Sequence, residues 1–174
     1  MPDPGSLEPP LDVLAAWHRQ GMALFDTMRR LARRAPAAAV DAAARHQADG
    51  VVAYFDRSIA VHHEDEERDL FPALIESMAG SDPVCLREMI AGLTDEHRAL
   101  AAGWRGLRPA FAALAAGTPA ALDPELVDAL IVQCEQLFRR EDEEMLPMAS
   151  RLLSDEARDE IFAGMLARRR RVPR

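Results

Sequence analysis

The chain has 174 residues, 49% of them hydrophobic and 29% charged, which is enough for one domain with a substantial core. Its net charge of -8 argues against nucleic acid as a partner, because binding to phosphates requires a basic surface. No stretch approaches the roughly 18 uninterrupted apolar residues of a membrane-spanning helix. We therefore expect a protein that binds neither nucleic acid nor membranes.

The N-terminal segment, MPDPGSLEPPL, lacks the basic and apolar regions of a signal peptide. Cys85 and Cys134 stand alone, as expected for reduced cysteines in the cytoplasm. All 21 basic residues are arginine, which suggests a GC-rich bacterial genome. We expect a cytoplasmic protein with a single domain over residues 7–170 and flexible ends at 1–6 and 171–174.

The sequence predicts an all-α fold, because helix-forming residues abound and no alternating strand pattern occurs. Asp82-Pro83 and Asp123-Pro124 each combine a capping aspartate with a proline in the first helical turn, and Gly80 and Gly117 supply stops. These signals predict five helices: about 10–34, one ending near 79, 83–116, 124–152 and 155–170. We predict an up-down-up-down four-helix bundle with a short additional C-terminal helix.

Each of the four long predicted helices carries an apolar stripe that a polar side chain interrupts. Apolar residues recur every three or four positions, as expected for a helix face buried in a bundle. A carboxylate that faces a core without a partner is costly or is forced to take up a proton, so the interruptions call for a common cause. They are His18 in the first helix, His62 and Glu66 in the second, His97 in the third and Glu141 in the fourth.

Counting residues from the helix-helix turns places most of these side chains at one height in the bundle. His97 and Glu141 are about equally far in sequence from the turn between the third and fourth helices. His62 and Glu66 are about as far from the turn between the second and third helices as His97 is. His18 and His62 are not equally far in sequence from the turn between the first two helices. About ten residues of PAAAVDAAARH must therefore overhang the bundle or form an irregular connection. Imidazoles and carboxylates on facing helices suit Fe, Mn or Zn. We therefore predict a transition-metal site formed by these five residues.

Several segments also resemble a known family. HHEDEERDLFPAL, residues 62–74, resembles the HHxxEExxLFP signature of the hemerythrin-like HHE cation-binding domains, and EDEEMLPMA, residues 141–149, resembles its counterpart in the fourth helix. LAAWHRQ and DEHRAL are similar to the segments that carry the histidines of the first and third helices, and GMLARRR to the terminal segment of many bacterial members. The resemblance implies a four-helix bundle holding non-haem iron, in which two carboxylates usually bridge two irons. It implies the same five ligands: His18, His62, Glu66, His97 and Glu141.

Two positions depart from the family pattern. Leu137 stands where the fourth-helix motif normally has a histidine, and Ala101 stands where the oxygen-carrying members have a second histidine in the third helix. Both missing ligands would belong to one metal. We therefore expect mononuclear or uneven binding, with the stronger metal on the side of His18 and His62.

Neighbouring polar residues have less direct roles in this interpretation. His63, Glu67 and Asp142 are rotated by about 100° from the ligand stripes. We expect them to lie beside the ligands or at the surface.

The leading hypothesis is a non-haem iron protein with one or two ions, Mn and Zn being the other candidates. It would sense or carry dioxygen, nitric oxide or redox state, or handle iron, and it is compatible with a homodimer. One alternative is a metal-free helical bundle that acts as an interaction module. The other is a di-iron oxidase or peroxidase; that class uses Glu-x-x-His on two helices, a spacing that none of the five histidines has. An enzymatic role is therefore the less favoured one.

Overall fold

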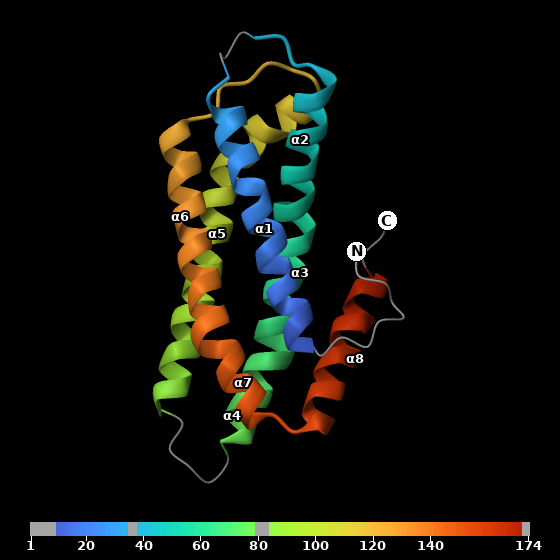
Figure 1. Cartoon of the computed structure of the whole chain (residues 1–174), viewed down its shortest axis with the longest axis vertical. Helices are drawn as coiled ribbons and strands as arrows, with labels where there is room; N and C mark the ends of the chain where they lie inside the picture. The colour runs from blue at the N-terminus through green and yellow to red at the C-terminus, as the bar shows by residue number, and fades with distance from the viewer. Residues whose placement is uncertain (1–9, 35–37, 79–83, 172–174) are drawn as a thin grey trace.

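The fold is an all-α bundle, as the sequence predicts. The computed structural model describes residues 10–34, 38–78 and 84–171, and these residues form helices and no strand. Four long helical rods alternate in direction, and a further helix leans against one end of the bundle (Figure 1). The predicted bundle with an additional C-terminal helix is confirmed. No helix in the described ranges is long and apolar enough to cross a membrane.

The second and fourth rods are each composed of several helical segments. The first rod is α1 (Pro10–Ala32) and the third is α5 (Val84–Ala115). The second rod contains α2 (Ala42–Ala53), α3 (Ile59–Asp65) and α4 (Phe71–Ser77), joined by π-helical turns at Tyr54–Ser58 and Glu66–Leu70. The fourth contains α6 (Pro124–Arg140), a π-helical turn at Glu141–Met145, and α7 (Leu146–Leu152). The C-terminal helix is α8 (Asp155–Arg171).

Where the structure describes them, the helix ends follow the signals in the sequence. Asp123 accepts hydrogen bonds from the backbone N–H groups of Glu125 at 2.9 Å and Leu126 at 3.4 Å, which caps α6. Gly117, with φ of 82°, adopts the left-handed conformation that commonly ends a helix, just after α5. The predicted signals at Gly80 and Asp82-Pro83 lie outside the described residues. So do the predicted flexible ends, apart from Arg171, which ends α8.

The first connection agrees with the sequence prediction in part. Asp41 accepts a hydrogen bond from the N–H of Ala44 at 2.7 Å, and α2 begins at Ala42, so the second half of PAAAVDAAARH is helical. The π-helical turn Tyr54–Ser58 follows before His62 is reached, and an i→i+5 turn holds one more residue than an α-helical turn. Because that turn adds a single residue, it accounts for only a small part of the extra length. The described residues 33–34 and 38–41 are not helical, so an irregular connection accounts for some of the rest.

The first two rods approach each other closely where Tyr54 of the second rod packs against α1. Tyr54 is almost fully buried, and its hydroxyl donates to the carbonyl of Trp17 at 3.1 Å. A Cβ atom at position 21 would lie 2.3 Å from that hydroxyl oxygen and 3.0 Å from the ring of Phe138. Only glycine at position 21 leaves room for the tyrosine. Tyr54 is therefore a core residue.

Ion pairs hold α8 against the second rod. Arg168 Nε and Arg169 Nη2 lie 2.8 and 2.7 Å from the two carboxylate oxygens of Asp65, and Arg168 also pairs with Asp69. The side chain of Asp65 is fully buried. Among the described residues, only these two arginines form ion pairs with its carboxylate and so compensate its negative charge. The guanidinium of Arg169 also lies over the ring of Trp17, 5.8 Å from its centroid.

Candidate metal centre

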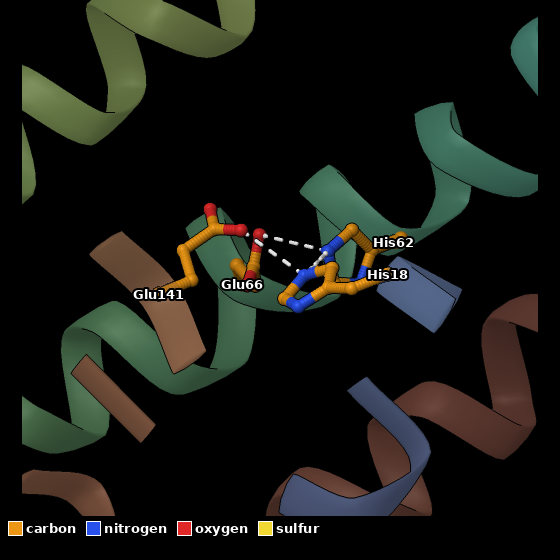
Figure 2. Close-up of side chains that lie close together, drawn as sticks. All are labelled: His18, His62, Glu66 and Glu141. Carbon is orange, nitrogen blue, oxygen red and sulfur yellow. Dashed lines mark hydrogen bonds and ion pairs between the residues drawn. The ribbon is translucent and has the colours of Figure 1, made fainter. Parts of the chain in front are cut away.

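A group of polar side chains lies in the interior of the bundle, where α1 meets the second and fourth rods. His18 projects from α1, His62 from α3, and Glu66 and Glu141 from the first residues of two π-helical turns (Figure 2). All four side chains have 0% exposure. Each offers one nitrogen or oxygen atom to a set whose members all lie within 4.8 Å of one another. These four residues could hold one metal ion.

The closest contacts in this group are between His18 and its neighbours. The Nε2 atom of His18 lies 2.9 Å from His62 Nε2 and 3.0 Å from Glu141 Oε2. His62 Nε2 lies 3.5 Å from Glu66 Oε2. Imidazole nitrogens and carboxylate oxygens thus point at a common centre, an arrangement suited to a transition metal.

His97, from α5, lies on the opposite side of the two glutamates. Its Nε2 atom is 3.1 Å from Glu141 Oε1 and 3.4 Å from Glu66 Oε2, and its side chain is 3% exposed. The structure therefore brings all five sequence-predicted residues together, four in the tight group and His97 across the two carboxylates. Their role as metal ligands stays a prediction.

Both glutamates begin a π-helical turn, a feature that the sequence analysis did not predict. The N–H of Phe71 bonds to the carbonyl of Glu66, and the N–H of Leu146 bonds to that of Glu141, in the i→i+5 pattern. A proline follows each time, and the proline ring cannot donate and clashes with the carbonyl four residues earlier. Such turns occur frequently at functional sites, and the Glu-to-Pro spacing of six residues was the available signal.

Two further carboxylates lie outside the group and contact the outer nitrogens of the histidines. Asp142 Oδ1 lies 2.8 Å from His18 Nδ1, and Glu67 Oε1 lies 2.8 Å from His97 Nδ1. Both carboxylates are partly exposed, in agreement with the expectation that they lie beside the predicted ligands or at the surface. His63 is also adjacent, since its ring stacks on that of His97 with 3.8 Å between centroids.

Burial and neighbouring charged groups shift the pKa values of the side chains in this group. Burial raises the pKa of Glu66 well above its usual range, and the charge of Glu141 adds to the effect. Burial lowers the pKa of His62 well below its usual range. Burial also lowers the pKa of His18, but hydrogen bonds to Asp142 and Glu141, together with their charges, outweigh it and raise the pKa to about 9.

Several atoms of the group lack the hydrogen bonds that buried polar atoms normally have. Among the described residues, both carboxylate oxygens of Glu66, Oε2 of Glu141 and Nδ1 of His62 have no hydrogen-bond partner. Glu66 Oε2 and Glu141 Oε2 still lie within ion-pair distance of imidazole nitrogens, so they face the centre without a well-directed bond. Buried polar groups of this kind are rare unless a water or an ion compensates them. The residues therefore fit a cation.

The two positions that depart from the family pattern differ in their surroundings. Leu137 is 1% exposed and lies one turn before Glu141, so its apolar side chain is part of the bundle interior. Ala101 is exposed on α5, although it lies one turn after the buried His97. Only the first of these positions therefore belongs to the interior.

A buried set of imidazoles and carboxylates, drawn from different rods of a helical bundle, indicates a cation-binding helical domain. The sequence matches the family model of the hemerythrin HHE cation binding domain over residues 9–149, and the chain belongs to that family. No curated protein matches the sequence. The matched segment contains all five predicted ligands and ends before α8.

Proposed function

We propose that this protein binds non-haem iron at the group formed by His18, His62, Glu66 and Glu141. The observation that supports the proposal is the convergence of two imidazole Nε2 atoms and two incompletely bonded carboxylates in a fully buried space. A cation there would compensate two carboxylates that are otherwise costly to bury. Mixed nitrogen and oxygen ligands suit iron, and they also accept Mn or Zn.

The proposed binding is uneven, with one strong position. His97 lies on the far side of Glu66 and Glu141, where a second ion would share those carboxylates. Leu137 offers no ligand atom on that side. We therefore propose one firmly held iron per chain and a weak or empty second position.

Iron at such a centre supplies redox chemistry and coordination positions for a small diatomic ligand such as dioxygen or nitric oxide. The protein residues bind the ion, exclude bulk water from it and orient the imidazoles. We favour sensing, carrying or iron handling over catalysis, since no Glu-x-x-His pair is present. Both cysteines are free, which supports a reducing compartment such as the cytoplasm.

The test is reconstitution of the metal-free protein with ferrous iron, followed by elemental analysis and Mössbauer spectroscopy. We expect close to one iron per chain in wild type and a large loss in a Glu66→Ala, Glu141→Ala double variant. Glu64→Ala, Glu143→Ala is the matched control, because both of these acids are exposed. A wild type that takes up no metal would instead favour the interaction-module hypothesis.

A further inference from the structure

Two pairs of adjacent acids occupy equivalent places in the bundle. Glu66-Glu67 and Glu141-Asp142 are the first two residues of their π-helical turns. In each pair the first side chain is fully buried in the central group, whereas the second is 39% exposed in Glu67 and 36% exposed in Asp142. The second acid contacts a histidine on another rod in both cases.

These contacts determine which imidazole nitrogen is available at the centre. Asp142, on the fourth rod, accepts a hydrogen bond from Nδ1 of His18, and Glu67, on the second rod, accepts one from Nδ1 of His97. A carboxylate at Nδ1 fixes the ring orientation and makes Nε2 the more basic ligand atom. The Nε2 atoms are the ones that face Glu66 and Glu141.

Ring stacking restrains the same two histidines further. The ring of His18 stacks on Phe138 with 4.6 Å between centroids and 14° between planes. The ring of His97 stacks on His63 at 3.8 Å and 3°. His62 has no comparable carboxylate, since its Nδ1 atom has no hydrogen-bond partner in the described part of the chain.

We infer that Glu67 and Asp142 are positioning residues, which hold His97 and His18 with Nε2 aimed at the metal. The inference rests on the proposed function, because it concerns the same centre. It explains why both motifs carry two acids in succession: successive helical residues point about 100° apart, so one can face inward while the next reaches a neighbouring rod. It also makes His62 the least restrained imidazole of the group.

The experiment uses zinc, a diamagnetic probe that suits calorimetry and NMR. Metal-free wild type, Glu67→Gln and Asp142→Asn are titrated with zinc, and the ¹⁵N-labelled, zinc-loaded proteins are examined for histidine Nδ1–H resonances. We expect wild type to show these resonances for His18 and His97. Each variant should lose the resonance of its own partner only and bind zinc roughly 10- to 100-fold more weakly.

Conservative and distant variants separate positioning from general damage. Glu67→Asp and Asp142→Glu keep a carboxylate and should retain the Nδ1–H resonances, whereas Glu64→Gln and Glu143→Gln should behave as wild type. If wild type binds zinc and both amide variants match its affinity and resonances, the inference is wrong while the proposed function stands. If wild type takes up neither zinc nor iron, the proposed function fails and the inference fails with it.

Discussion

The Nε2 atoms of His18 and His62 face each other at 2.9 Å in the interior of the bundle. Asp142 accepts a hydrogen bond from Nδ1 of His18, so Nε2 is the nitrogen that His18 directs toward the centre. Two such nitrogens at this distance need either a shared proton or a cation between the side chains. The nearby carboxylates of Glu66 and Glu141 favour a cation.

Metal removal should therefore destabilise the wild-type protein. Bound metal stabilises the folded state by about 2.7 kcal/mol when the free metal is at 100 times its dissociation constant. We expect chelation to lower the melting temperature of wild type and of Glu64→Ala, and to change Glu66→Ala and Glu141→Ala very little. Differential scanning calorimetry with and without chelator checks this. Equal sensitivity in all four proteins would show that the metal binds elsewhere.

Metal affinity should increase with pH. The pKa of His18 is raised to about 9, so this imidazole is protonated in the metal-free protein at neutral pH, and burial also raises the pKa of Glu66. A metal ion must displace the proton from His18 Nε2, and this competition weakens as the pH approaches 9. Titration calorimetry in two buffers of different ionisation enthalpy should detect proton release. A pH-independent affinity with no released protons would contradict this prediction.

A histidine at position 137 should strengthen the second metal position. Leu137 is buried one turn before Glu141, so Leu137→His would place an imidazole beside the two shared carboxylates. We expect the iron count per chain to rise toward two by elemental analysis. Ala101→His is the comparison, because position 101 is exposed and should add little. A wild-type count of two tightly held irons would refute the uneven binding.

Two glycines should respond to alanine with opposite signs. Gly21→Ala would push a Cβ atom to within 2.3 Å of the Tyr54 hydroxyl, and overpacking of this kind costs roughly 1–3 kcal/mol. A Cβ atom at position 50 would meet no heavy atom within 4 Å, so Gly50→Ala should gain roughly 0.5–1 kcal/mol of helix propensity. Urea denaturation measures both. Similar effects at the two positions would mean that Tyr54 can move aside.

The docking of α8 should contribute strongly to stability. Arg168→Ala or Arg169→Ala removes a partner of the fully buried Asp65, and breaking a buried pair costs up to roughly 3–5 kcal/mol. Arg170→Ala, at an exposed position of the same helix, is the control. Unfolding free energies from urea titrations should separate them. A loss no larger than that of Arg170→Ala would show that the ion pairs are of little consequence.

Most of the fold and of the candidate site could be predicted from the helical periodicity of the sequence. Apolar stripes report which face of a helix is buried, and a polar interruption is conspicuous against them, so His18 and Glu141 could be found from spacing. The stripes do not show which side-chain atoms form hydrogen bonds with one another. The bonds from Glu67 and Asp142 depend on how neighbouring rods are rotated, and that rotation is a property of the packed bundle.

Other features depended on local backbone or long-range contacts. The π-helical turns at Glu66 and Glu141 each precede a proline, and apolar periodicity does not detect such local changes in backbone hydrogen bonding. The pairing of Asp65 with Arg168 joins positions more than a hundred residues apart in the chain. The partner of this arginine could not be identified without the fold.

Asp65 and Glu66 are consecutive residues, and both are fully buried. The negative charges of their two carboxylates are compensated from different sources. Asp65 receives its counter-charge from α8, a covalent part of the same chain, whereas Glu66 depends on protons or on an ion from solution. A chain shortened before Asp155 would lose the first source and leave a second group of acids open to cations. Metal stoichiometry measured on such a fragment would therefore include adventitious ions, and only a chain that retains α8 gives the occupancy of the central group.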